Sequence, residues 1–293
     1  MKESDYKRSL KFPPSEEILD LLFYRPVAFV VVKAIARFPI TPNQITLASL
    51  AAGLAAAVEF ASGSRPGLIW GALLYALANV LDCADGQLAR LQKSGTLLGR
   101  VVDGAADYLS GIAIFIGLGI GLASSGAAAW LLIAISGVSS GLQAMFFDRY
   151  QSEFISSAAG EPDFADREIT RFQIELGRMR HAGRDLVRPL LLQLYIGYLE
   201  AQQRFRGRDR VDRKTSGGQS PDRALMIRLW SVLGPTTNRS LLIVCAFAGR
   251  IDIYLWAIAI GGNAWLLAIA TLQSRIRSGE ASPQTSASTR QTR

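Results

Sequence analysis

Six apolar stretches, each long enough to cross a lipid bilayer as a helix, dominate this sequence. They span about 42–62, 67–90, 97–123, 126–147, 224–248 and 251–274. An α-helix needs roughly 20 apolar residues to cross the hydrocarbon core. The chain is 49% hydrophobic over 293 residues with a mean hydropathy of +0.22, which suits neither a disordered chain nor an ordinary soluble domain. We therefore predict an all-α, polytopic membrane protein with six transmembrane helices.

The placement of Lys and Arg predicts which ends of these helices face the cytoplasm. Positive residues gather in 1–40, in 149–223, in the turn after the second stretch and in the tail, whereas the opposite loops carry only Arg65 and Arg250. Cytoplasmic loops usually carry such an excess. We therefore expect a cell (inner) membrane protein with both termini cytoplasmic. The net charge of +8 follows mainly from this topology, and no nucleic-acid-binding module accompanies it.

The apolar stretches divide the chain into regions. These are a cytosolic N-terminus (1–40), transmembrane helices 1–4 (41–148), a cytosolic insert (149–222), transmembrane helices 5–6 (223–275) and a disordered cytosolic tail (276–293). Residues 15–38 are interpreted as an interfacial helix, because charged side chains interrupt an apolar run; a further span is the alternative. The insert is predicted to be helical, with an amphipathic helix at 186–199 and a loop at 204–222. It either lies near the mouth of a site or is a linker without a catalytic role.

Four aspartates lie inside or beside the second and third stretches, where ionisable groups are costly and usually mark a functional site. They are Asp82, Asp85, Asp103 and Asp107. At about 100° per residue, the first two share one helix face and the last two share another. The first face also carries Gly86, Ala89 and Arg90, and the second carries Thr96 and Gly99. Two facing helices would therefore present one pocket with four carboxylates, open to the cytoplasm.

Carboxylates gathered in a low-dielectric pocket need a cation to stay ionised together. A ligand set of oxygens, without His or an obvious thiolate, favours Mg²⁺ or Mn²⁺ over zinc or copper. Gly86 and Gly99 leave room for a ligand close to the backbone, and Arg90 offers a planar cation suited to phosphate. Together these features predict a metal-dependent site for a phosphate-bearing substrate. A divalent-cation transporter is a distant alternative that leaves the glycines and Arg90 unexplained.

The spacing of these residues, D-x2-D-G-x2-A-R-x8-G-x3-D-x3-D from Asp82 to Asp107, resembles a family motif at all eight of its positions. The family is the CDP-alcohol phosphatidyltransferases, integral membrane enzymes that move a phosphoalcohol from a CDP-linked donor to an acceptor hydroxyl and release CMP. Thr41-Pro42-Asn43-Gln44 resembles the stretch that opens the family's first transmembrane helix and lines its nucleotide site. The resemblance covers roughly 15–148 well and the last two spans loosely.

The resemblance implies a role for each matching residue. Asp82, Asp85 and Asp103 map to ligands of Mg²⁺ or Mn²⁺, with two ions expected. Asp107 maps to the catalytic base, which can also touch a metal. The CDP-linked donor is expected to contact Thr41, Pro42, Asn43, Gln44, Asp82, Gly86, Ala89, Arg90, Thr96 and Gly99. A carboxylate base suits a chain whose single histidine, His181, lies in the divergent insert. The family also implies a homodimer.

The substrates are less well determined by the motif, because it contacts the CDP diphosphate that all donors share. The resemblance favours transfer of phosphatidyl from CDP-diacylglycerol to a small polar acceptor such as glycerol phosphate or inositol phosphate, in phospholipid synthesis. A CDP-linked polar alcohol such as CDP-inositol is the alternative donor. Arg239, whose guanidinium is costly to leave alone in the fifth stretch, is a candidate to bind the acceptor or to pair with a motif acid. Arg149 is a weaker acceptor candidate. Membrane lipids are the remaining expected partners.

Overall fold

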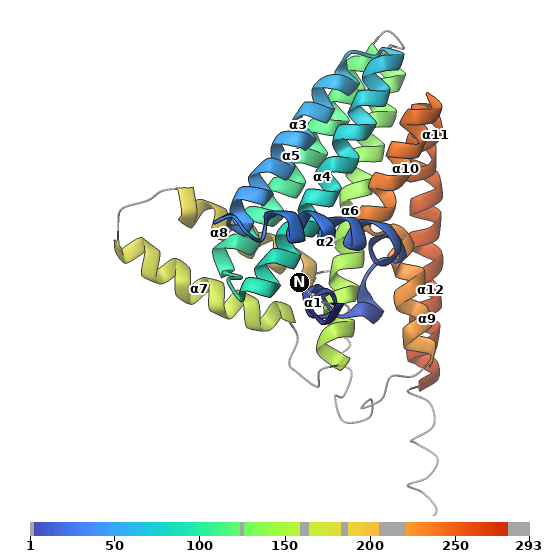
Figure 1. The fold of residues 1–293 in the computed structure, drawn as a ribbon. Coiled ribbons are helices and arrows are strands. Elements are labelled where there is room, and N and C mark those ends of the chain that lie inside the picture. Colours follow the sequence, from blue (N-terminus) through green and yellow to red (C-terminus); the bar gives the residue numbers. More distant parts are fainter. Residues whose placement is uncertain (1–2, 124–125, 159–163, 183–186, 205–220, 281–293) are drawn as a thin grey trace, which may run out of the picture.

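The computed structural model describes residues 3–123, 126–158, 164–182, 187–204 and 221–280, and within them the chain is helical with no strand. Five segments are long and apolar enough to cross a membrane. They are α3 (Pro42–Ala61), α4 (Arg65–Gln92), α5 (Leu97–Gly121), α6 (Ala127–Ala158) and the segment Ile251–Arg275. Figure 1 shows α3 to α6 running side by side. The chain is therefore the all-α, multi-pass membrane protein that the sequence predicts.

Local capping signals define where the helices that carry the motif begin. Pro42 is the first residue of α3, a position where its missing N–H costs nothing. The Thr96 hydroxyl accepts a hydrogen bond from Gly99 N at the start of α5, as a helix cap does. Further along, a side chain at Gly117 of α5 would collide with the Ala57 carbonyl of α3. Glycine therefore permits the close packing of α3 against α5.

The predicted fifth span, 224–248, is not one continuous helix. It consists of α9 (Pro221–Trp230), a short 3-10 turn η4 (Ser231–Leu233) and α10 (Pro235–Ala248). Proline cannot donate to the preceding turn of a helix, so α10 restarts after Gly234, which has extended backbone. The sixth stretch follows as α11 (Ile251–Trp256), a π-helical turn η5 (Ala257–Gly262) and α12 (Asn263–Glu280).

The N-terminal residues form short helices that cross one side of the bundle. They are α1 (Glu3–Ser9), η1 (Pro13–Ser15), η2 (Asp20–Tyr24) and α2 (Arg25–Ile35). Figure 1 shows α2 lying across the long helices instead of parallel to them. One face of this segment buries Ala28 and Val32, while Leu22 and Val30 are exposed. This amphipathic arrangement is compatible with the interfacial helix that the sequence predicts, which stays a prediction.

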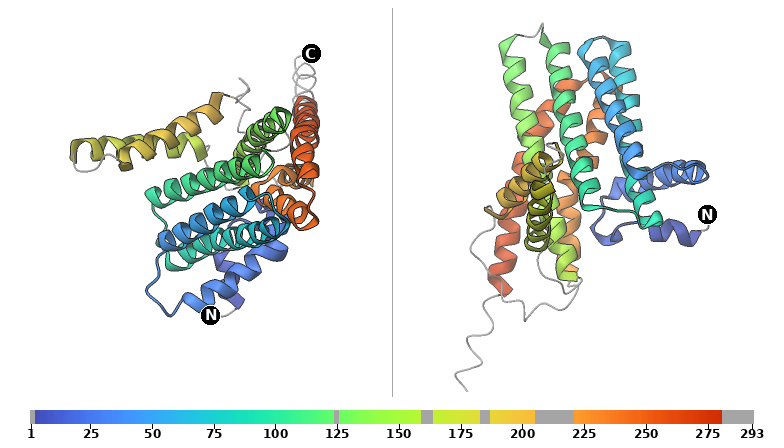
Figure 2. Two further views of the ribbon diagram at one scale, coloured as in Figure 1. Left: turned by 90° about the horizontal axis from the view of Figure 1, so that it is seen from above. Right: turned by 90° about the vertical axis from the view of Figure 1, so that its left-hand side faces the viewer.

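The insert packs as a helical hairpin. Helix α6 continues through the predicted boundary at 149, and α7 (Phe164–Ala182) and α8 (Val187–Arg204) follow it. Figure 2 shows this hairpin and the N-terminal helices on opposite sides of α3, α4 and α5. The predicted loop residues 205–220, the side chain of His181 and the tail residues 281–293 lie outside the described part of the chain. Helix α12 runs to Glu280, so the boundary predicted for the tail at 276 is too early.

Candidate active site

A cavity of about 1970 Å³ opens between α4, α5, α6, α8 and α10. Most residues that the sequence singled out line it. They are Thr41, Pro42, Asn43, Asp82, Asp85, Gly86, Ala89, Arg90, Thr96, Gly99, Asp103, Asp107, Arg149 and Arg239. Gln44 is the exception: its side-chain Oε1 accepts a hydrogen bond from Thr41 N at 2.9 Å. The structure thus gives Gln44 a capping role at the start of α3 and leaves it outside the cavity.

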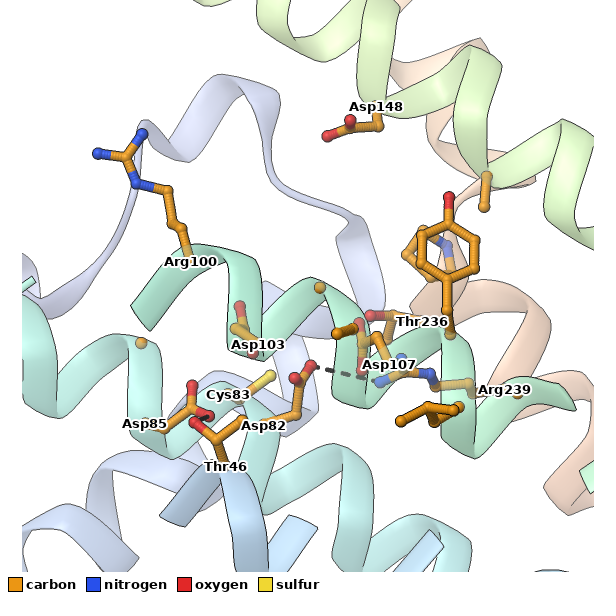
Figure 3. A pocket seen from close by; sticks show the side chains of 18 of the residues that line it. Thr46, Asp82, Cys83, Asp85, Arg100, Asp103, Asp107, Asp148, Thr236 and Arg239 are labelled. Carbon is orange, nitrogen blue, oxygen red and sulfur yellow. Dashed lines mark hydrogen bonds and ion pairs between the residues drawn. The ribbon is translucent and has the colours of Figure 1, made fainter. Parts of the chain in front are cut away.

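Three of the four motif carboxylates converge on one point. Asp82, Asp85 and Asp103 each place a carboxylate oxygen within 4.8 Å of the others, and Figure 3 shows them pointing toward one another from α4 and α5. Asp85 is only 5% exposed. Helical spacing places each pair of acids on one face of its helix, but only the packing of both α4 and α5 on α3 decides that these three oxygens meet.

Asp107 lies one turn further along α5 and outside this three-carboxylate group, although all four motif acids line the same cavity. Its Oδ1 forms an ion pair with Arg239 Nη2 at 2.7 Å, and Arg239 Nη1 lies 3.3 Å from Asp82 Oδ2. Figure 3 shows this guanidinium between the two acids. Arg239 also donates to Asn79 Oδ1 at 2.9 Å and is 13% exposed. The sequence offered Arg239 two roles, binding the acceptor or pairing with a motif acid, and the structure shows the pairing.

Two polar side chains that the sequence did not single out contact Asp85 and Arg239. Thr46 of α3 donates a hydrogen bond from Oγ1 to Asp85 Oδ2. Asn79 is buried on α4 and accepts from Arg239. Asn79 lies three residues before Asp82, so helical spacing places both on one side of α4, and this signal was available. No local pattern pointed to Thr46, because its partner lies 39 residues away in the chain.

The arginine and glycine of the motif form the floor of the cavity toward the N-terminal segment. Arg90 donates from Nε to the carbonyl of Ser9, while its buried Nη2 has no hydrogen-bond partner among the described residues. A side chain at Gly86 would come within 3.4 Å of this guanidinium. Glycine therefore keeps open the space in front of a buried donor that a phosphate oxygen could use.

The wall opposite the acids comes from α6 and from the insert. Asp148 of α6 accepts a hydrogen bond from the Tyr198 hydroxyl at 3.4 Å, and the Tyr198 ring meets the Tyr108 ring of α5 edge to face at 5.7 Å between centroids. Burial, followed by the negative charge of Asp148, raises the pKa of Tyr195 to about 12. Its phenol therefore stays a hydrogen-bond donor. All four side chains line the cavity together with Arg149.

The hairpin is attached to the start of α5 by an ion pair and an apolar cluster. Arg100 Nη1 lies 2.7 Å from Glu168 Oε2, and Glu168 is only 3% exposed. Figure 3 shows Arg100 pointing away from the aspartates. Val101 packs in a cluster with Phe172, Leu176, Leu192, Ile196 and Leu199. The insert therefore packs on the helix that carries Asp103 and Asp107, and α8 lines the cavity.

The donor atoms present fit a hard divalent cation. They are all carboxylate oxygens, which Mg²⁺ and Mn²⁺ prefer. Asp103 Oδ1 is buried without a hydrogen-bond partner among the described residues, and such an orphaned oxygen is expensive unless something binds it. Asp82, Asp85 and Asp103 could therefore hold a metal ion, whereas Asp107 is engaged by Arg239.

Fold and site together define a multi-pass membrane protein with a carboxylate cluster in a cavity at one end of its bundle. Comparison with known proteins gives a consistent result. The sequence model of the CDP-alcohol phosphatidyltransferase family matches residues 39–162. The archaetidylinositol phosphate synthase of Methanothermobacter thermautotrophicus is 33% identical over 148 residues, covering 50% of this chain and 72% of that protein. The chain therefore belongs to the CDP-alcohol phosphatidyltransferase family.

Two further relatives match over shorter segments. The phosphatidylinositol phosphate synthase of Corynebacterium glutamicum is 38% identical over 85 residues, which cover 29% of this chain and 38% of that protein. The enzyme of the same name from Mycolicibacterium smegmatis is 40% identical over 95 residues, which cover 32% of this chain and 40% of that protein. The chain thus spans about two fifths of the length of these two relatives. The insert lies almost entirely beyond the family match.

Proposed function

We propose that this protein is a CDP-alcohol phosphatidyltransferase that moves phosphatidyl from CDP-diacylglycerol to a hydroxyl of a small polar phosphate ester and releases CMP. The observation that carries this proposal is the convergence of Asp82, Asp85 and Asp103 within 4.8 Å, in a cavity that also contains Arg90 and Gly86. Of the two acceptors considered, inositol phosphate is preferred over glycerol phosphate, since two relatives are named phosphatidylinositol phosphate synthase and a third archaetidylinositol phosphate synthase.

In this proposal the three converging aspartates hold Mg²⁺ or Mn²⁺, with two ions expected. A divalent cation there supplies positive charge to the diphosphate of the donor. Arg90 adds a guanidinium for a donor phosphate, and Asn43, Thr96 and Gly99, which lie together beside it, contact the cytidine part. Asp85 is kept in orientation by the Thr46 hydroxyl.

Asp107 is proposed as the base that takes the proton from the acceptor hydroxyl. It is 39% exposed toward the cavity, and Arg239 at 2.7 Å fixes the direction of its carboxylate. A base must lie within hydrogen-bond reach of the proton that it takes, and orientation of the reacting groups supplies much of the rate. Arg149, across the cavity on α6, is proposed to bind the phosphate of the acceptor.

A lipid donor is supported by the apolar part of the cavity. Its wall between α5 and α6 includes Ile112, Ile116, Ile133, Val138 and Trp130, of which Ile112, Ile116 and Val138 are more than half exposed. Apolar side chains leading from a polar site suit acyl chains, because such a wall continues the hydrocarbon layer in which the acyl chains lie. A CDP-linked polar alcohol as donor remains the alternative. The cell membrane location, cytoplasmic termini and homodimeric state are proposals that rest on the charge pattern and on the family.

Purified protein with Mn²⁺ and radiolabelled donors tests this function. CDP-diacylglycerol or CDP-inositol is combined with inositol phosphate or glycerol phosphate, and CMP release is measured for each pair. We expect turnover with CDP-diacylglycerol and inositol phosphate, and its loss in Asp85→Asn. Turnover with CDP-inositol alone would move the assignment to the alternative donor. Mn²⁺ flux into vesicles without CMP release would instead support a transporter.

A further inference from the structure

A stripe of polar side chains on the N-terminal segment binds the first turns of α10. Glu17, Asp20 and Tyr24 lie at helical spacing on η2 and the residues before it, and so face the same side. Each makes a hydrogen bond to α10. This contact joins residues that lie 216 to 220 positions apart in the chain. The N-terminal segment lies outside the part of the chain that the family model matches.

Glu17 caps α10 from outside that helix. Its carboxylate accepts hydrogen bonds from Thr236 N at 3.1 Å, from Thr237 N at 2.8 Å and from the Thr237 hydroxyl at 2.8 Å. The first amides of a helix have no partner within it, and negative charge at this end is favourable. Glu17 is 3% exposed, and a side chain at Gly234 would collide with its carboxylate. Glycine at position 234 therefore leaves the space that the Glu17 carboxylate occupies.

The other two residues of the stripe continue the contact toward the motif. Asp20 Oδ1 accepts from the Thr236 hydroxyl at 3.0 Å and from Cys83 Sγ at 3.6 Å. Asp20 therefore touches both α10 and the residue next to Asp82. Tyr24 shares a hydrogen bond with Ser240 at 3.0 Å. Together the three side chains hold the first turns of α10 against α4.

Arg239 lies on α10 between the residues that this stripe holds. Its guanidinium bridges Asp82 and Asp107 at 3.3 and 2.7 Å, so a shift of α10 would move it out of reach of one acid or both. We propose that Glu17 is a positioning residue that holds α10, and through it Arg239, in register with the two acids. The inference rests on the proposed function, in which Asp107 is the base.

A double-mutant cycle in the purified full-length chain tests this inference. CMP release is measured for wild type, Glu17→Ala, Arg239→Ala and the double variant. Asp252→Asn, which removes an exposed acid on α11, is the control for loss of a carboxylate elsewhere in the chain. We expect Glu17→Ala to lower kcat by about 10-fold to 100-fold, since small misplacements near the reacting groups have effects of this size. The KM of the donor should change less than threefold. In the Arg239→Ala background the same change should have under a threefold effect.

Effects of the two substitutions that multiply would overturn the inference, because Glu17 would then act independently of Arg239. The same holds if Glu17→Ala keeps kcat within twofold of wild type. Glu17→Gln keeps one acceptor oxygen for Thr236 N and provides a milder second variant if Glu17→Ala does not fold. The kcat of Glu17→Gln should lie between those of wild type and Glu17→Ala. A wild-type chain that releases no CMP from any donor would defeat the proposed function itself, whereas an active wild type with multiplicative effects defeats only the role of Glu17.

Discussion

The two walls of the cavity are built in different ways. On one wall the reactive side chains come from a short, continuous part of the chain, Asp82 to Asp107 on α4 and α5. The other wall combines Asp148 of α6 with Tyr198 of α8, which lies 50 positions further along the chain. The first wall contains groups suited to a diphosphate and a metal ion. The second wall surrounds the remaining space, where an acceptor would lie.

The walls also differ in how firmly they are packed. Helices α3 and α5 approach so closely that Gly117 touches the backbone of Ala57, which leaves the helix that carries Asp103 and Asp107 little freedom to shift. The second wall is attached through aromatic contacts, through the apolar cluster around Val101 and through the ion pair of Arg100 with the buried Glu168. These contacts join side chains, whereas α3 and α5 meet through their backbones. We therefore expect substitutions in the first wall to affect the chemical step, and substitutions in the second to affect acceptor binding.

The largest effect is expected for Asp103→Asn. The change removes one charge from the three converging carboxylates and one oxygen suited to a divalent cation. We expect CMP release to fall by more than about 10³-fold and Mn²⁺ affinity, measured by electron paramagnetic resonance, to fall with it. Asp252→Asn serves as the control for loss of an acid elsewhere. Retention of a tenth of the wild-type rate would mean that the converging acids are not the metal site.

Asp107→Asn should separate the base from the metal ligands. Because Asp107 lies outside the three-carboxylate group and pairs with Arg239, Mn²⁺ affinity should stay within about threefold of wild type. The rate should fall by about 10²-fold to 10⁴-fold, the usual contribution of a positioned acid or base. Single-turnover measurement of CMP release checks this. A wild-type rate in this variant would show that the base assignment is wrong.

Thr46→Val should test whether support from α3 matters to the first wall. The substitution removes the hydroxyl that donates to Asp85 with little change of shape. Groups that orient metal ligands usually contribute about 10-fold to 100-fold in affinity or activity, and we expect a loss in Mn²⁺ affinity of that order. Thr46→Ser, which keeps the hydroxyl, is the matched control. Equal behaviour of both variants would contradict the role of the hydrogen bond.

Tyr198→Phe should produce a smaller effect, limited to the second wall. The change removes the hydroxyl that donates to Asp148 but keeps the ring against Tyr108. A neutral hydrogen bond contributes about 0.5–1.5 kcal/mol, so the KM of the acceptor should rise by about 2-fold to 10-fold while that of CDP-diacylglycerol stays unchanged. Initial rates at varied concentrations of each substrate measure this. A rise in the KM of the donor instead would erase the proposed division between the walls.

The smallest effect concerns pH and the cap on α10. Burial, reinforced by Asp20, raises the pKa of Glu17 from 4.5 to about 7. The folded chain thus binds this proton more tightly than the unfolded chain, and the resulting stability is full below about pH 4.5 and is lost as the pH rises through about 7. We expect the thermal midpoint in detergent to fall between pH 5 and pH 8 by more in wild type than in Glu17→Gln. An equal fall in both proteins would assign the pH dependence to other groups.

Several features of the fold and the site could be predicted because they depend on local periodicity. Bilayer-length apolar stretches predicted all five of the candidate membrane spans among the described residues, and helical spacing placed Asp82 and Asp85 on one face. The break before α10 was missed although Gly234 and Pro235 signalled it, because the apolar composition on both sides suggested one span. Helical spacing did not show that three of the acids converge while Asp107 pairs with Arg239, since periodicity within each helix does not specify how two helices are offset.

The sequence by itself determined the class of fold, the membrane-spanning stretches and the acids that belong together, because these follow from helix period, bilayer thickness and the cost of burying charge. Only the tertiary structure decided that Arg239 bridges Asp82 and Asp107, that Thr46 holds Asp85, that α8 lines the cavity and that Glu17 caps α10. These contacts join side chains from distant parts of the chain. Their geometry depends on how the helices pack, which no local pattern of residues records.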